Sequence, residues 1–179
     1  MNNLETVYRE GRLIRRAWSS VDNGRQLLCW LTALAGDPET RPETCSAHLC
    51  PPWLAYWLPW ADDSGTAEAW PRHVERLIRV APLLGDINPE QSRRLDLLFR
   101  REALLVARDS AGSSVAVVDR VLALIDRALA GADLTKDEWA AAAARWADAD
   151  AAAARWAAAD AADRIISACL GHLEREVAP

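Results

Sequence analysis

Residues 135–177 read TKDEWAAAAARWADADAAAARWAAADAADRIISACLGHLEREV, and this alanine-rich segment is the most informative part of the chain. Two near-copies follow each other directly, AAAARWADAD over residues 141–150 and AAAARWAAAD over residues 151–160. Alanine has the highest helix propensity of all residues, and Thr135 followed by Glu138 has the spacing of a capping box. The stretch therefore predicts one long helix over residues 135–177.

Three tryptophans lie on one seam of this expected helix, because the seam positions alternate by threes and fours. These positions are Trp139, Ala142, Trp146, Ala149, Ala153 and Trp156, and Arg145 and Arg155 each precede a tryptophan. Indole rings bury large areas and are enriched at binding hot spots. The seam therefore favours helix packing or recognition of a partner protein over catalysis. Either the protein's own bundle or a partner is expected to cover the rings.

A continuous helix of this length would span roughly 60 Å, which exceeds what a compact domain of this size can bury along its full length. Part of the helix is therefore expected to project, to bend or to contact another chain. Self-association through this helix is one way to cover it.

The rest of the chain also predicts helices. Apolar residues at helical spacing, with proline and glycine at the ends, favour helices over Arg25–Ala35, Trp53–Leu58, Pro89–Arg108, Val115–Ala130 and a segment from Pro71 that Pro82 kinks or ends. Residues 1–20 carry mixed signals, and a helix there would place Val7, Leu13, Ile14 and Trp18 on one face. No segment shows convincing alternation of apolar and polar residues. We therefore expect an all-α bundle of about six helices in one domain, residues 1–179, with bundle helices over 1–134 and the long helix over 135–177.

Composition and charge narrow the class of protein. The chain has 179 residues, 51% of them hydrophobic, and a net charge of −5 with both signs interspersed. Such a charge does not suit a polyphosphate binder or an acidic DNA mimic, so nucleic acid is not the expected ligand. The chain starts without the apolar core of a signal peptide and has no run of eighteen apolar residues. We therefore expect a cytoplasmic protein whose four cysteines are reduced thiols.

Cysteine and histidine form a candidate metal site. Cys45, His48 and Cys50 are close in sequence, and Cys169 and His172 share the spacing of Cys45 and His48. Thiolate and imidazole are zinc ligands, and two ligands from each segment would close a structural site. The alternative is that the cysteines are small buried hydrophobic residues and that no cofactor is bound.

Arginines recur every seven residues on the helix expected over Pro89–Arg108. Arg94, Arg101 and Arg108 would line one stripe, able to bind a phosphate backbone or an acidic partner. Local ion pairs offer another interpretation, since Glu90 precedes Arg94 and Asp96 precedes Arg100 by four residues.

Motifs of catalysis are missing from the sequence. It has no glycine-rich phosphate loop, no G-x-S-x-G elbow and no H-E-x-x-H. His73-Val74-Glu75 resembles the H-x-E of zinc deaminases, but no P-C-x-x-C follows. The adjacent Asp62 and Asp63 are expected to form a turn and a helix cap rather than an acid–base pair. We therefore do not expect an enzyme.

Three segments carry a resemblance to other proteins: CSAHLCPPWLAYWLPWADD, RRLDLLFRREAL and ALAGADLTKDEWAAAAARW. Over about the last three quarters of the chain, they are similar to uncharacterised helical proteins of phages and prophages of GC-rich bacteria. The alanine repeats with spaced tryptophan and arginine also resemble bacterial immunity-type proteins. The resemblance implies a small cytoplasmic protein from mobile DNA that inhibits or neutralises another protein by binding it. It assigns no functional residue.

The first functional hypothesis is a non-enzymatic protein-binding protein, such as a phage-encoded inhibitor of a bacterial defence complex of the anti-CRISPR type. It would act by surface occupation through the tryptophan seam or the arginine stripe. Alternatives are a toxin-neutralising immunity protein, a zinc-stabilised domain or metal-dependent enzyme using the cysteine–histidine set, and a structural oligomer.

Overall fold

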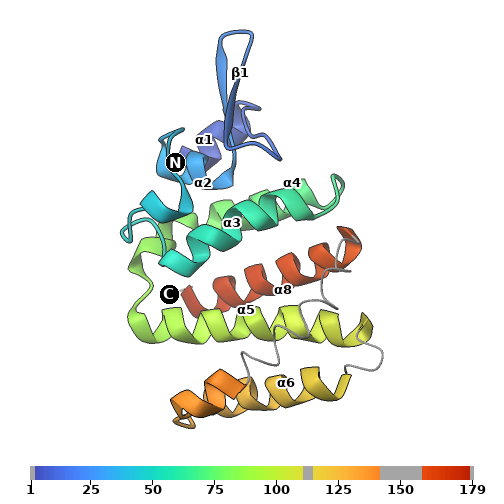
Figure 1. The fold of residues 1–179 in the computed structure, drawn as a ribbon. Helices are drawn as coiled ribbons and strands as arrows, with labels where there is room; N and C mark the ends of the chain where they lie inside the picture. The colour runs from blue at the N-terminus through green and yellow to red at the C-terminus, as the bar shows by residue number, and fades with distance from the viewer. Residues whose placement is uncertain (1–2, 111–114, 142–158, 178–179) are drawn as a thin grey trace.

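The computed structural model describes residues 3–110, 115–141 and 159–177, and this part of the chain is mainly α-helical (Figure 1). Its main α-helices are α1 (Asn3–Arg9), α2 (Trp30–Ala35), α3 (Pro52–Ser64), α4 (Trp70–Val80), α5 (Pro89–Ser110), α6 (Val115–Leu129) and α8 (Ala159–Val177). Two 3₁₀ helices, η1 (Pro42–Thr44) and η2 (Ala81–Asp86), and two strands, β1 (Ser19–Asp22) and β2 (Arg25–Leu28), complete the described elements. The expected helical class is confirmed, with a small hairpin added to it.

The helices stack in layers on either side of α5 (Figure 1). The last helix, α8, lies between α4 and α5, and α6 packs against the opposite side of α5. The hairpin, α1 and α2 lie at the end of the molecule far from α6. None of the described helices is long and apolar enough to cross a membrane.

The larger core forms around α8. Its apolar face is buried against α3, α4 and α5, and its buried residues are Ala162, Ile165, Ile166, Cys169, Leu170 and Leu173. Arg76 of α4 donates to the carboxylate of Glu174 at 2.7 and 3.1 Å and holds the two helices together. The apolar face of α8 is therefore occupied inside the molecule rather than free to pair with a second copy.

A smaller core joins α5 to α6. Its buried residues are Leu104 from α5 and Val118, Val121, Leu122 and Ile125 from α6. Trp139, beyond the end of α6, packs against this cluster and is half-buried. One of the three seam tryptophans therefore contacts the protein's own bundle.

The expected helix over residues 135–177 is described at its two ends. Thr135 and Glu138 form the expected capping box: the Thr135 hydroxyl accepts the Glu138 N–H at 3.2 Å, and the Glu138 carboxylate accepts the Thr135 N–H at 2.8 Å. Residues 136–141 are helical beside α6, whereas α8 lies on the other side of α5 (Figure 1). The chain between them, residues 142–158, lies outside the described residues.

The hairpin corrects two expectations, the helix over Arg25–Ala35 and the absence of strands. β1 and β2 pair antiparallel with Asp22 opposite Arg25, so Asn23 and Gly24 form a two-residue turn. Both turn residues have positive φ, 50° and 74°, which is the requirement of a type I′ turn. The strands are mostly exposed and therefore carry no apolar alternation. Only Trp30–Ala35 of the expected helix is helical.

The helical face expected within residues 1–20 is also wrong beyond α1. The first helix ends at Arg9, and Gly11 adopts a left-handed φ of 65°. Leu13 then forms a parallel bridge with Leu28, and Ile14 donates its N–H to the Leu28 carbonyl at 2.9 Å. Leu28 and Leu13 thus tie this segment to the hairpin instead of extending the helix.

The helix end predicted from Pro82 is confirmed, whereas the one predicted from Pro59 is wrong. η2 replaces the α-helix at Ala81, in agreement with the expected break at Pro82. In contrast, α3 continues through Pro59 to Ser64, although a proline removes one helix hydrogen bond. Burial of Leu58, Ala61 and Asp62 around and beyond Pro59 stabilises the continuation.

The expected helices over 89–108 and 115–130 are confirmed as α5 and α6. Asn88 caps α5 because its side-chain oxygen accepts the Gln91 N–H at 2.9 Å, and the Gln91 side chain accepts the Asn88 N–H at 3.1 Å. The residues that begin or end a helix therefore allowed the positions of α5 and α6 to be predicted from sequence.

Gly85 marks a close approach between two segments. The loop that carries His48 crosses η2 so closely that a Cβ at Gly85 would collide with the His48 carbonyl oxygen. In contrast, a Cβ at Gly171 in α8 would lie 3.3 Å from nitrogens at the flexible ends of Arg76 and Arg175. At Gly85 the obstructing atom belongs to the backbone, so no side-chain movement can make room for a Cβ.

We expect Gly85→Ala and Gly171→Ala to change stability in opposite directions. Gly85→Ala forces the backbone of the His48 loop to move and should lower the free energy of unfolding by about 2 kcal/mol. Gly171→Ala removes a glycine from a helix interior and should raise it by up to about 1 kcal/mol. Urea denaturation followed by circular dichroism measures both values. Equal stability of Gly85→Ala and the wild type would contradict the close approach.

Candidate functional site

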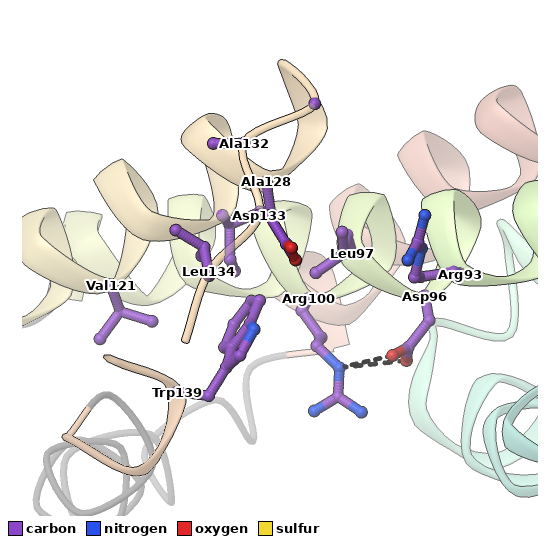
Figure 2. A pocket seen from close by; sticks show the side chains of 12 residues that line it. Arg93, Asp96, Leu97, Arg100, Val121, Ala128, Ala132, Asp133, Leu134 and Trp139 are labelled. Atoms are coloured by element: carbon purple, nitrogen blue, oxygen red, sulfur yellow. Dashed lines mark hydrogen bonds and ion pairs between the residues drawn. The ribbon is translucent and has the colours of Figure 1, made fainter. Parts of the chain in front are cut away.

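A groove lies between α5, α6 and the segment 131–139 (Figure 2). Its volume is about 830 Å³, and its lining residues are Arg93, Asp96, Leu97, Arg100, Val121, Ile125, Ala128, Gly131, Ala132, Asp133, Leu134 and Trp139. Pockets of this size bind small ligands or the anchor residues of a peptide. We call this feature the Trp139 groove.

Helix periodicity aligns the two long walls of the groove. On α5, Arg93, Leu97 and Arg100 are spaced by four and three residues and therefore share a face. On α6, Val121 and Ile125 are one helical turn apart and are buried in the smaller core. The apolar parts of these residues form the base of the groove, with arginine heads at its edge.

Trp139 is held in place by the start of its own helix. Besides the capping box, Glu138 accepts a hydrogen bond from Arg127 of α6 at 3.0 Å. The hydrogen bond from the Thr135 backbone, followed by the contact with Arg127, lowers the pKa of Glu138. The carboxylate is therefore charged at neutral pH, and it fastens the first turn of this helix to α6 beside the indole.

The charged residues at the edge differ in their partners. Both oxygens of Asp96 accept from Nε of Arg100 at 3.0 Å, which is the local ion pair expected from sequence. No partner is recorded for Arg93 within the described ranges, and its side chain is exposed. Arg93 is therefore available to a carboxylate or phosphate that approaches the groove.

The arginine stripe is engaged within the protein. Arg94 pairs with Glu176 of α8 at 3.0 Å, Arg101 pairs with Asp126 of α6 at 2.7 Å, and Arg108 pairs with Asp119 of α6 at 2.5 Å. The stripe thus connects α5 to the helices on both sides. These exposed ion pairs contribute little to stability individually.

The other predicted partner-binding residues, Trp146, Trp156, Arg145 and Arg155, lie outside the described residues. Their expected roles stay predictions.

The residues of the predicted metal set occupy different surroundings. The sulfurs of Cys45 and Cys50 are 3.9 Å apart, and His48 is exposed. Cys169 is buried in the core, while His172 contacts Glu102 at 3.0 Å and Arg175 at 2.9 Å. Over residues 3–110, 115–141 and 159–177, no three His, Cys, Asp or Glu side chains lie close enough together to hold a metal ion.

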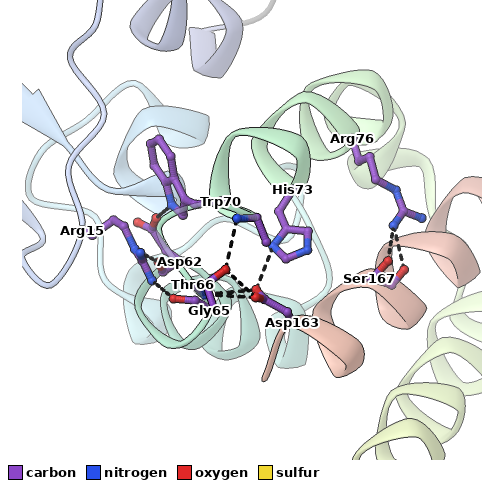
Figure 3. Close-up of polar contacts among 10 residues, drawn as sticks. Arg15, Asp62, Gly65, Thr66, Trp70, His73, Arg76, Asp163 and Ser167 are labelled. Atoms are coloured by element: carbon purple, nitrogen blue, oxygen red, sulfur yellow. Dashed lines mark hydrogen bonds and ion pairs between the residues drawn. The ribbon is translucent and has the colours of Figure 1, made fainter. Parts of the chain in front are cut away.

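Asp62 is the most strongly buried acid in the described structure and corrects the expectation that it forms a turn (Figure 3). It lies inside α3 with 0% exposure, and its carboxylate accepts from Nε1 of Trp70 at 2.7 Å and from the Trp30 N–H at 3.1 Å. Arg15 donates to its backbone oxygen at 2.7 Å. Burial raises the pKa of Asp62 to about 7, despite the two hydrogen bonds that favour the ionised form.

A second polar cluster, which includes His73, joins α8 to the start of α4 (Figure 3). Asp163 accepts from the Thr66 hydroxyl at 2.6 Å and from its N–H at 3.1 Å, and its Oδ1 lies 3.7 Å from Nδ1 of His73. Burial lowers the pKa of His73, and the nearby Asp163 opposes this effect. The carboxylates of Asp62 and Asp163 are both hydrogen-bonded within the chain, so the two clusters connect neighbouring helices.

The chain matches no protein-family model, no curated protein and no solved structure.

Sequence analysis identified Trp139 but missed the groove around it. Arg93 and Leu97 belong to the α5 face that turns toward α6, and their register with Val121 depends on how the two helices pack. The apolar stripe of α6 was visible in the sequence, yet nothing in the sequence showed that Trp139 would pack beside it.

We expect Asp62→Asn to alter the pH dependence of stability. The folded pKa of about 7 exceeds the unfolded value of about 3.9, so the folded state holds more protons in this range. The contribution of Asp62 to stability therefore falls as the pH rises from 4 to 7. From pH 5 to pH 8, the stability of the wild type relative to Asp62→Asn should fall by on the order of 1–3 kcal/mol. The opposite contribution of His73 is present in both proteins and cancels.

Urea denaturation at pH 5, 6, 7 and 8 measures this difference. The exposed Asp86, replaced by asparagine, serves as the control and should give a curve parallel to that of the wild type. Parallel curves for Asp62→Asn would show that burial does not raise this pKa.

Proposed function

We propose that the protein is a non-enzymatic binding protein that docks a short segment of another protein in the Trp139 groove. The observation that carries the proposal is the half-buried indole of Trp139, which lines a groove of about 830 Å³. Tryptophan and arginine are the residues most enriched at binding hot spots.

The lining residues favour binding over catalysis. Within residues 3–110, 115–141 and 159–177, the lining includes no histidine, cysteine, serine, threonine, tyrosine or lysine, and its acids are Asp96 and Asp133. Asp96 is already paired with Arg100. The groove therefore offers neither a nucleophile with a base partner nor an acid–base pair.

The chemistry of the groove describes its partner. Leu97, Leu134 and Trp139, the half-buried apolar residues of the lining, suit an apolar or aromatic anchor side chain. Arg93, exposed at the edge, suits a carboxylate near that anchor. A short segment with one bulky apolar residue and a neighbouring acid fits both features.

The narrower proposal is inhibition of a bacterial defence complex of the anti-CRISPR type. It is supported by the sequence resemblance to phage and prophage proteins and by the lack of catalytic groups in the groove. Surface occupation requires a stable docking site and no chemistry.

Variants of the groove test the binding proposal. Peptides selected from a displayed random library against the wild-type protein should bind with the anchor and acid described above. Trp139→Ala and Arg93→Glu should each weaken the best peptide at least about tenfold by calorimetry. Ala132→Trp, which fills the groove from an exposed position, should do the same without removing a core contact.

Trp60→Ala is the matched control, because Trp60 is a partly exposed tryptophan of α3, 38% exposed and remote from the groove. It should leave the affinity unchanged. Each variant is first checked for a wild-type circular dichroism spectrum. Selection of no peptide, or equal affinity for Ala132→Trp and the wild type, would refute docking in the groove.

A plasmid-interference assay tests the narrower proposal. Expression of the wild type or Trp60→Ala in bacteria with an active CRISPR effector should raise plasmid recovery, and Ala132→Trp should not. Unchanged recovery with the wild type would exclude inhibition of that effector and leave the peptide-binding result intact.

A further inference from the structure

Cys45 and Cys50 form a close pair of thiols at one end of the larger core. They lie in the loop between η1 and α3, and their sulfurs are 3.9 Å apart. All four cysteines of the chain are described, and all are free thiols. We call these two residues the thiol pair.

The geometry of the pair is compatible with a bond. A disulfide requires sulfurs about 2.05 Å apart, so they must approach by roughly 2 Å. Cys50 is fixed, because it is 1% exposed and directly precedes Pro51, the N-cap of α3. Cys45 ends η1 at the other side of the loop and is only half-buried. The movement can therefore occur mainly at Cys45.

The other two cysteines have no such neighbour. Cys29 is buried and contacts the Thr32 hydroxyl at 3.5 Å, and Cys169 is 0% exposed within α8. The thiol pair is thus the only recorded contact between two sulfurs in the described structure.

We propose that Cys45 and Cys50 form a reversible intramolecular disulfide when the protein meets a peroxide oxidant. This modification is independent of the Trp139 groove.

The reaction balances with hydrogen peroxide as the oxidant. The Cys45 sulfur, once deprotonated, attacks one peroxide oxygen, the O–O bond breaks, and Cys45 becomes a sulfenic acid while water leaves. The Cys50 thiolate then attacks the Cys45 sulfur, the S–O bond breaks, and a second water leaves. In total, two thiols and one peroxide give one disulfide and two waters. A dithiol reductant reverses the change.

Cys45 reacts first because it is the accessible member of the pair. Burial raises the pKa of both thiols, so they rest protonated at neutral pH. Oxidation of Cys45 should therefore be slow. The disulfide forms because the two sulfurs are close together, and not because either thiol is unusually acidic.

The bond would restrain a loop that already fits tightly. Residues 45–50 include His48, whose carbonyl lies against Gly85, and they lead directly into α3. A cross-link there limits the unfolded chain and keeps the loop on η2. The oxidised protein should therefore melt at a higher temperature than the reduced protein.

Mass spectrometry of the full-length protein tests the proposal. After treatment with excess peroxide and alkylation under denaturing conditions, the wild type should lose two hydrogens and retain two alkylatable thiols, Cys29 and Cys169. Fragmentation should place the missing hydrogens between Cys45 and Cys50. Reduction should restore four thiols and the original melting temperature.

Cys45→Ser is the informative variant, since its site is half-exposed and the substitution should not disturb folding. Its Cys50 should stay a free thiol after peroxide treatment. Ser46→Ala, a neighbouring change that keeps both sulfurs, should form the disulfide like the wild type. Oxygen addition at Cys45 with Cys50 still free, a disulfide between two molecules, or four unmodified thiols would each overturn the proposal.

Discussion

The burial of α5 on two opposite faces is the constraint on which the structure depends. Leu95 and Phe99 face the core shared with α8, whereas Leu104 faces the core shared with α6. Apolar burial contributes about 25 cal/mol per Å², so a helix covered on both sides stabilises two layers at once. The charged residues of α5 are left to the rims of these interfaces. There Arg94, Arg101 and Arg108 find acids on the flanking helices, which explains why an arginine stripe can be structural.

The same arrangement explains why one groove stays open. α6 covers part of the second face of α5, and the turn after Gly131 returns the chain along it toward Trp139. The indole packs against the smaller core on one side and, among the described residues, borders the Trp139 groove on the other. The molecule thus separates its closed polar clusters, around Asp62 and Asp163, from its accessible apolar surface.

Sequence alone was sufficient to predict a helix start where neighbouring side chains cap that helix. Asn88 with Gln91 and Thr135 with Glu138 form reciprocal caps between residues three apart, so sequence placed those starts correctly. The hairpin was missed because its strands are exposed and carry no apolar alternation, and its one clear signal, the turn dipeptide Asn23-Gly24, was not used. Burial of Asp62 was beyond sequence analysis, since its partners Trp30 and Trp70 come from other helices. The position of α8 between α4 and α5 likewise depends on contacts such as Arg76 with Glu174, which are 98 residues apart.

The insertion of α8 between earlier helices also bears on how the protein is made. Ile166 and Leu170 fill the space between α4 and α5, yet a ribosome releases them only after those helices have emerged. Until then, the nascent chain exposes the apolar faces that α8 later covers. Contacts over such separations slow folding and prolong the exposure of apolar surface. Synthesis of this protein should therefore place a demand on chaperones that bind nascent chains, greater than its modest length alone would suggest.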